Sequence, residues 1–97
     1  MKTDNLVVGQ RVILKIRIMN EPVGSVGFVF SEYPDFDDPT KTGVQIIFQN
    51  GFYDGFSHKE QCEILEVGRV DSRYSTYKFE NVNQVWRDYK NGYWKFQ

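Results

Sequence analysis

Asp54, Ser57 and His58 supply the residue types of a hydrolytic triad, in which a base activates a hydroxyl nucleophile and a carboxylate orients the base. Neighbouring residues of an extended chain point to opposite sides, so Ser57 and His58 are not expected to share a hydrogen bond. Glu60 follows Ser57 by three residues, which is the spacing of a helix capping box. We therefore predict that Ser57 caps one short helical turn, that His58 is solvated, and that the chain is not an enzyme.

Asp35, Asp37 and Asp38 form an acidic cluster, and carboxylates are the ligands that hard cations prefer. A calcium loop of the EF-hand type needs a glycine at its sixth position, where Thr40 stands here, and the glutamate at its twelfth position is also missing. The cluster therefore predicts a solvated acidic loop and no metal site.

Aromatic residues accompany these aspartates. Tyr33 and Phe36 lie in the same stretch. The stretch would present a partly aromatic face whose aspartates mimic the negative charge of phosphates. Our hypothesis is that this face binds a basic partner, because complementary charge favours such an encounter. Alternation along the next strand places Phe52 and Phe56 on one face and Tyr53 on the other, so Tyr53 is the better candidate for an exposed contact.

The C-terminal part of the chain interleaves aromatic and basic residues. This composition resembles the stacking and cation–π chemistry of proteins that bind single-stranded nucleic acid. A helix-spaced stripe (Val82, Val85, Trp86 and Tyr89) instead favours packing on the body or a homodimer seam through this helix. Packing is the stronger interpretation, and it leaves Tyr93, Trp94 and Phe96 as candidates for contact with a partner.

Arg11, Lys15 and Arg17 lie on the outer face of the first predicted strand and carry an alternative, nucleic-acid-binding interpretation. The overall charge opposes it. Residues 1–68 carry six Lys and Arg against ten Asp and Glu, and residues 69–97 carry six against three. Strong attraction to phosphates needs clustered basic residues, so the acidic body disfavours it.

Apolar alternation predicts three strands with a shared interior. Residues 11–18 form the first, and the inward sets are Val12, Leu14, Ile16 and Ile18, then Val26, Phe28 and Phe30, then Val44, Ile46 and Phe48. A loop is expected over 33–41, which holds two prolines and three aspartates. Asn50 and Gly51 predict a type I′ hairpin turn that leads into a strand over 52–56.

The remaining elements follow from capping and periodicity. Residues 62–67 are expected to form a fifth strand, in which Cys62 would be an unreactive thiol. Residues 73–79 predict one more strand. Residues 81–90 predict a helix that Asn81 caps and Gly92 ends.

Composition sets the outer limits. The chain has 97 residues, of which 40% are hydrophobic and 16% aromatic, and we expect a single domain over 1–97. One cysteine and one histidine allow neither an internal disulfide nor a zinc site of ordinary type, and no cofactor motif is present. No run approaches the ~20 apolar residues of a membrane span. We therefore expect a cytoplasmic protein without a membrane partner.

Three stretches together resemble the SH3-like small β-barrels of the KOW and Tudor type: residues 8–12, residues 24–29, and residues 43–56 with the Ser57 turn and Ile64. The resemblance covers residues 6–67 and implies a mainly β fold, a five-stranded barrel on which 68–97 packs as a strand and helix extension. The loop over 31–41 is longer than such barrels need. Barrels of this kind bind peptides, modified side chains, RNA or proteins, so the resemblance implies binding rather than catalysis.

The prediction is therefore a non-enzymatic binding module that acts through protein–protein contacts, a small accessory or inhibitory protein of the kind that phages and plasmids encode. The alternative is a nucleic-acid-binding barrel of the KOW type. The salt dependence of binding distinguishes protein binding from nucleic-acid binding, because binding through phosphate contacts weakens steeply as ionic strength rises.

Overall fold

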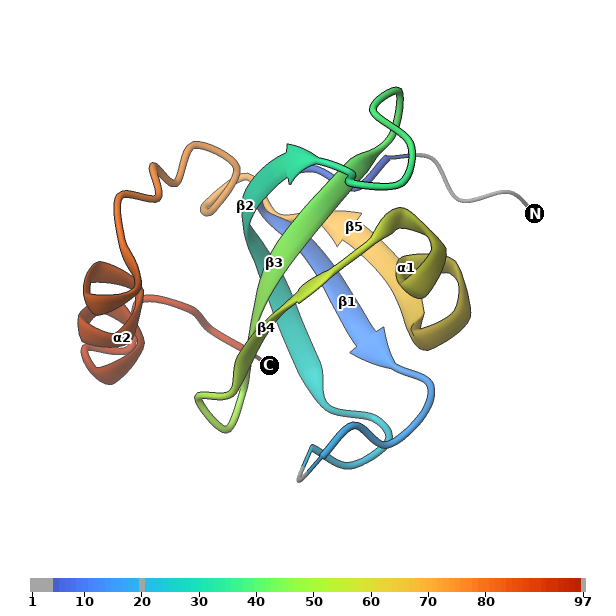
Figure 1. The fold of residues 1–97 in the computed structure, drawn as a ribbon. Coiled ribbons are helices and arrows are strands. Elements are labelled where there is room, and N and C mark those ends of the chain that lie inside the picture. Colours follow the sequence, from blue (N-terminus) through green and yellow to red (C-terminus); the bar gives the residue numbers. More distant parts are fainter. Residues whose placement is uncertain (1–4, 20, 97) are drawn as a thin grey trace.

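The computed structural model describes residues 5–19 and 21–96, which form five strands and two helices (Figure 1). In chain order these are β1 (Gln10–Leu14), β2 (Val26–Pro34), β3 (Thr42–Phe48), β4 (Tyr53–Phe56), α1 (His58–Ile64), β5 (Leu65–Val70) and α2 (Val82–Lys90). The strands make one antiparallel sheet in the order β4-β3-β2-β1-β5. The predicted mainly β class is confirmed.

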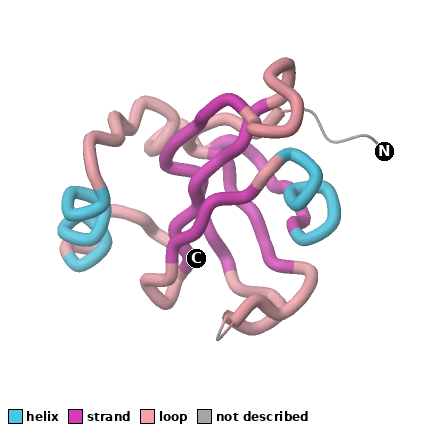
Figure 2. The backbone as a smooth tube through the Cα atoms, in the orientation of Figure 1, coloured by secondary structure: helices cyan, strands magenta, loops and turns pink. Residues whose placement is uncertain are grey.

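The sheet is open, because its edge strands β4 and β5 do not pair with each other in the described part of the chain. Helix α1 follows β4 and leads directly into β5, so it links the two edges (Figure 2). Phe56 of β4 and Leu65 of β5 are both buried in the same core. The sheet thus curls around a common interior without the hydrogen bonds that would close a barrel.

The inner core takes the alternate residues of every strand. Its buried members are Leu6, Val12, Leu14, Val29, Val44, Ile46, Phe48, Phe56 and Leu65. Phe48 contacts Phe56 edge-on, with 6.1 Å between the ring centroids. The predicted inward positions of Val12, Leu14 and the Ile46 set are confirmed.

A second core lies on the opposite face of the sheet, and it corrects the expectation of one shared interior. Phe28 and Phe30 do not join Val12 and Ile46, but pack outside the sheet with Ile47 and residues of the C-terminal part, namely Tyr74, Val85 and Trp94. The physical reason is that residues 71–96 cover this face, so β2 is apolar on both sides. Figure 1 shows α2 and the last residues on the β2–β3 side of the sheet.

The first strand is shorter than predicted, since β1 ends at Leu14. Beyond it, the Lys15 amide still donates to the Ile64 carbonyl (2.7 Å), but the chain bends at residues 15–16 and leaves the sheet. Ile18 and Glu21 then exchange two backbone hydrogen bonds of 3.0 and 2.7 Å. Ile16 is consequently 48% exposed, and its predicted inward position is wrong.

Two turns also differ from the expectation. Strand β2 runs to Pro34, so Tyr33 and Pro34 belong to the sheet and the loop spans only 35–41. Pro34 is the last residue of the strand, where a missing amide donor is tolerated. The turn before β4 is not of type I′, because Gly51 (φ +88°) adopts a positive φ and Asn50 does not. The Gly51 amide donates to the Phe48 carbonyl at 2.8 Å.

Ser57 caps α1 as predicted. Its Oγ accepts from the Glu60 amide at 3.3 Å, and Glu60 Oε1 accepts from the Ser57 amide at 2.9 Å. The helix continues for seven residues rather than one turn, because the Gln61 side chain is buried and donates to the Phe56 carbonyl at 3.0 Å. Cys62 therefore lies on α1 and is exposed, so its predicted place in a buried fifth strand is wrong.

Removal of this cap gives a testable change in stability. Ser57→Ala is expected to lower the free energy of unfolding by about 1 kcal/mol, because the Glu60 amide loses its acceptor. Urea denaturation measures the difference. Ser57→Asp is the matched control and should keep most of the stability, since aspartate caps helices as well as serine. Equal loss in both variants would show that capping is not the reason.

The C-terminal part contains turns and one helix. Residues 73–79 form no strand; the amides of Tyr74 and Tyr77 close successive turns on Asp71 and Tyr74. Helix α2 is as predicted, with Asn81 Oδ1 accepting from the Gln84 amide at 2.9 Å. It ends at Lys90 with Asn91 as its C-cap, and Gly92 (φ +76°) follows in the left-handed conformation that terminates the helix, as predicted.

Candidate functional site

Tyr33 lies near the end of β2, on the outer face of the sheet. Its ring covers Gly43 of β3 and Gly55 of β4. A Cβ atom at Gly43 would overlap the ring, and one at Gly55 would stand 3.0 Å from the Tyr33 hydroxyl oxygen. Because two glycines on adjacent strands lack a side chain here, the Tyr33 ring can pack directly on the backbone of β3 and β4.

Three acidic side chains act electrostatically on this phenol. Partial burial, and then the negative charges of Glu60, Asp35 and Asp54, raise the pKa of Tyr33 above its ordinary value. The phenol, which is protonated at neutral pH even at its ordinary pKa, therefore stays a hydrogen-bond donor to higher pH. Three acidic groups from a loop, a strand and a helix thus act on the same ring.

Phe36 projects from the 35–41 loop beside Tyr33. It is 92% exposed, and its ring centroid lies 6.2 Å from that of Tyr33. Asp37 is exposed next to it. We call this surface the acidic–aromatic face, composed of Tyr33, Asp35, Phe36, Asp37, Asp54 and Glu60.

The three loop aspartates have different surroundings. Asp35 is buried, at 7% exposure, whereas Asp37 is exposed. Asp38 accepts from the hydroxyl and the amide of Thr40 at 2.6 and 3.1 Å, and these bonds lower the pKa of Asp38. In the described ranges, no group of three or more acidic, histidine or cysteine side chains is placed to hold a metal ion.

Tyr53 shares the outer face with Tyr33. It pairs with Ile47 across β3 and β4, two residues before Gly55, and it is 41% exposed. Phe52 and Phe56 instead contact Phe48 in the inner core, as the alternation predicted. Tyr53 is therefore available for contact at the margin of the acidic–aromatic face.

Tyr93 and Trp94 are placed differently from each other. Trp94 is 3% exposed and packs against Tyr77, with ring centroids 5.1 Å apart. Tyr93 is 38% exposed and contacts Tyr74 at 5.4 Å between centroids. Trp94 is thus a core residue in this conformation, and only Tyr93 is open to a partner.

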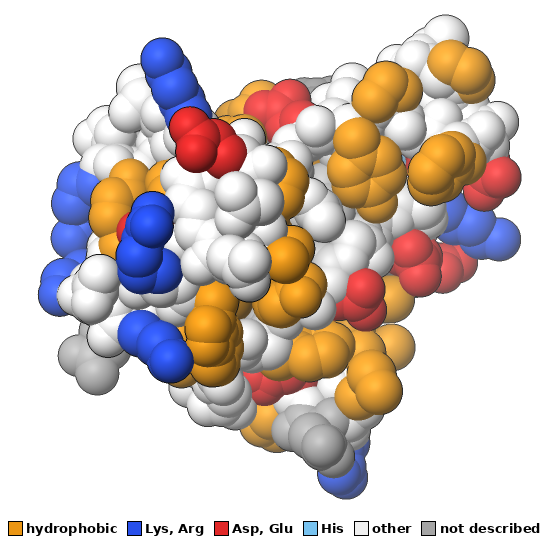
Figure 3. Space-filling view, turned by 60° about the vertical axis from the view of Figure 1, so that its left-hand side comes forward, with side chains coloured by type: hydrophobic (Ala, Val, Ile, Leu, Met, Phe, Trp, Pro, Cys, Tyr) orange, Lys and Arg blue, Asp and Glu red, His pale blue; other side chains and the backbone are white. Residues whose placement is uncertain are grey.

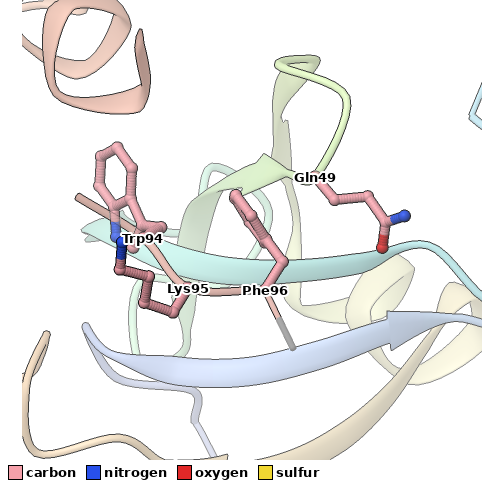
Figure 4. Close-up of a pocket in the computed structure, with 4 residues that line it drawn as sticks. All are labelled: Gln49, Trp94, Lys95 and Phe96. Atoms are coloured by element: carbon pink, nitrogen blue, oxygen red, sulfur yellow. The ribbon is translucent and has the colours of Figure 1, made fainter. Parts of the chain in front are cut away.

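A cavity of about 500 Å³ lies beside the C-terminal residues, lined by Gln49, Trp94, Lys95 and Phe96. Figure 4 shows the Gln49 amide directed away from Trp94, with Phe96 between them. The buried Trp94 Nε1 has no hydrogen-bond partner. The polar groups do not converge on one point, so we do not take this cavity as the site.

Two of the basic residues of the alternative interpretation donate to backbone carbonyls. Lys15 Nζ donates to the Cys62 carbonyl, and Arg17 Nε donates to the Met19 carbonyl, both at 3.2 Å. Arg11 instead lines a cavity of about 290 Å³ together with Arg69, which the sequence interpretation had not included.

The triad types do not assemble. Ser57 Oγ is used in the helix cap, and Asp54 Oδ1 accepts from the Gly55 amide at 2.8 Å. The buried His58 Nδ1 has no partner, so the expectation of a solvated His58 is wrong at this atom. No hydrogen bond links these three side chains in the part of the chain that the structure describes.

Hydrophobic side chains remain exposed between basic and acidic groups across one face of the molecule (Figure 3). Neither helix within the described ranges has the length and apolar content needed to cross a membrane. Comparisons of the chain with protein-family models, with curated proteins and with solved structures find no match. The candidate site therefore stands on geometry alone.

Sequence reasoning found part of the acidic–aromatic face. Tyr33, Phe36 and the loop aspartates stand close together in the sequence. Asp54 and Glu60 were read only as a triad member and a capping residue, because nothing local indicates that they approach Tyr33. The alternation of glycines at 43 and 55 with apolar residues was the available signal for a ring packed over the strands.

Proposed function

We propose that this chain is a non-enzymatic binding module whose acidic–aromatic face contacts a basic segment of a partner protein. The observation that supports it is Phe36, which is 92% exposed beside a tyrosine on which three acidic groups act electrostatically. Exposed aromatic rings supply the apolar contact area of interfaces, and the carboxylates supply charge complementarity. We include in this proposal that the chain acts as an accessory or inhibitory protein through such contacts.

The finer fold assignment belongs to this proposal. An SH3-like arrangement is supported by the curled sheet, whose edges are linked by α1 and share one core. A cytoplasmic setting is supported by the exposed free thiol of Cys62, which stays reduced there. The homodimer contact through α2 stays a prediction. Trp86 of this helix is 43% exposed, so its ring is accessible to a second copy of the chain.

Nucleic-acid binding has weaker support. The face that exposes an aromatic ring carries acidic groups and would repel phosphates, while Lys15 and Arg17 already donate to backbone carbonyls. A single-stranded thymidine oligonucleotide is the probe for this alternative. Binding to it that weakens steeply with salt, with no binding to basic peptide, would replace the protein-binding proposal.

A basic peptide tests the proposal directly. The probe is a five-residue peptide with four arginine or lysine residues around one leucine, titrated while backbone amide NMR signals are recorded. We expect saturable shifts in residues 33–38 and 54–60. Phe36→Ser combined with Asp37→Ser should weaken binding by ~10-fold or more, because an exposed anchor ring and a neighbouring charge are lost.

The matched control exchanges one exposed apolar and one exposed acidic residue elsewhere. Ile16→Ser combined with Glu66→Gln should leave the peptide affinity unchanged, since both residues are exposed and neither belongs to the acidic–aromatic face. Equal weakening in both double variants, or unchanged affinity in the Phe36 and Asp37 variant, would contradict the proposed face.

A further inference from the structure

Glu21 is a buried acid with an incomplete set of partners. It lies in the loop between β1 and β2 and is 2% exposed. Its Oε2 accepts from Asn50 Nδ2 at 3.0 Å, whereas the buried Oε1 has no hydrogen-bond partner. Among the described residues, the ion pairs are Arg73 with Asp71 and Arg87 with Asp88, so no cation pairs with Glu21.

Such an arrangement is unfavourable in an isolated protein. A buried carboxylate loses its hydration, and one neutral hydrogen bond replaces only part of it. Natural folds seldom leave a charged oxygen in this condition without a function or an unseen partner. Glu21 is therefore the least satisfied acidic group of the described chain.

A cavity of about 360 Å³ adjoins this carboxylate. It is lined by Glu21, Asn50, Gly51 and Phe52. Asn50 uses its amide nitrogen on Glu21, which leaves its carbonyl oxygen as a second acceptor. The lining thus combines a carboxylate, an amide oxygen and an aromatic ring, all of which attract cations.

Both walls of the cavity are held in place. Glu21 is fixed by its two backbone hydrogen bonds with Ile18. On the other side, Gln49 Oε1 accepts from the Val26 amide at 2.9 Å and the Gln49 carbonyl accepts from the Tyr89 hydroxyl at 2.8 Å. Hydrogen bonds that do not involve a ligand therefore fix the backbone of Glu21 and of Gln49, the residue before Asn50, whereas the Glu21 side chain itself must turn for binding.

The loop that carries Glu21 also exposes apolar side chains. Met19 is 74% exposed and Val23 62% exposed. Met19 has φ +49°, a conformation that non-glycine residues seldom adopt. The loop that carries Glu21 therefore has exposed apolar side chains available for contact.

We propose that this cavity binds the charged end of an organic cation, an alkylammonium or guanidinium group, which Glu21 neutralises. Oε1 is closed to solvent in the present conformation, so binding requires the Glu21 side chain to turn toward the cavity. The site is separate from the acidic–aromatic face, because the loop over 35–41 and the loop over 15–25 lie at opposite ends of the sheet (Figure 1). The proposal therefore goes beyond the proposed function and does not rest on it.

The test titrates the full chain with n-butylammonium, n-butylguanidinium and acetyl-lysine methylamide, with n-butanol as the neutral probe. We expect saturable NMR shifts for the Asn50 side-chain amide, Gly51 and Phe52 with the cations and none with n-butanol. The lysine derivative distinguishes a protein side chain from a free amine as the source of the cation. Because n-butanol is tested on the unchanged chain, this comparison does not depend on any variant.

Glu21→Gln is the decisive variant, since it keeps the size of the side chain and removes the charge. It should weaken cation binding by at least ~10-fold, because a charge-assisted hydrogen bond is lost. Its thermal stability without ligand should equal or exceed that of the unchanged chain, since an unpaired buried charge disappears. Glu63→Gln, an exposed acid outside the cavity, should leave binding unchanged.

Three outcomes would overturn the inference: no saturable shift with any cation, equal shifts with n-butanol, or cation shifts that persist in Glu21→Gln. Detection of a bound water at Glu21 that the cations do not displace would also overturn it, because that water would be the missing partner.

Discussion

Trp94→Ala is expected to lower the free energy of unfolding by about 3–5 kcal/mol. Trp94 is 3% exposed and stands between Phe30 and Tyr77, with centroid distances of 6.5 and 5.1 Å. Its loss would open a large void in the outer core and leave Phe30 without its cover. The last residues of the chain would then detach from the sheet, so the effect tests whether the outer core is part of the cooperative fold.

Urea denaturation followed by circular dichroism measures this loss. Trp94→Phe is the matched control and should lose far less, because a ring remains and the unpartnered buried indole Nε1 is removed. Lys95→Ala changes the exposed neighbour and should stay within about 0.5 kcal/mol. A loss below about 1 kcal/mol for Trp94→Ala would mean that the C-terminal residues do not stabilise the sheet.

The same outer core marks the limit of what alternation can predict. Period-two patterns correctly grouped Phe28 with Phe30, because side chains two apart share a face of a strand. They could not say which face, since both sides of β2 are apolar and Val29 equally suits a core position. The answer depends on residues 71–96, which are distant in sequence and cover one side.

Element ends were predicted well where a local signal controls them. Ser57 and Asn81 are helix caps in the structure, because a cap needs only a side chain and an amide three residues away. The end of β1 at Leu14 was not predicted, because the chain bends at residues 15–16 and Ile18 and Glu21 then close a turn, although the apolar alternation continues. Apolar residues after Leu14 continue the pattern without continuing the strand.

The candidate site divides in the same way. Tyr33, Phe36 and Asp37 were recognised from local composition, since aromatic and acidic residues stand together there. Glu21 was not among the predicted site residues, because glutamate is seldom buried and nothing in its local sequence indicates burial. Its burial follows from the contact with Asn50, which lies on another turn. A contact between two turns that are distant in the sequence cannot be predicted from the residues next to either turn.

Gly9→Ala is expected to lower the free energy of unfolding by about 2–5 kcal/mol, as backbone strain adds to a steric overlap. Gly9 has φ +94°, and a Cβ atom there would stand 2.7 Å from both the Cα and the amide nitrogen of Ser75. These are main-chain atoms, which cannot rotate away as a side chain can. Gly9 also accepts from the Asp71 amide at 2.9 Å, so the overlap would strain the point where the C-terminal part begins.

Gly24→Ala separates the cost of backbone strain from the cost of steric overlap. Gly24 has nearly the same φ, +92°, but no atom lies within 4 Å of a Cβ there, so only the strain of about 1–2 kcal/mol applies. Thermal and urea unfolding of both variants gives the difference in their losses of stability. That difference measures how strongly the main chain of residues 71–75 resists a side chain at Gly9. Equal losses would mean that this approach relaxes without resistance, and the outer core would then be attached only through its aromatic contacts.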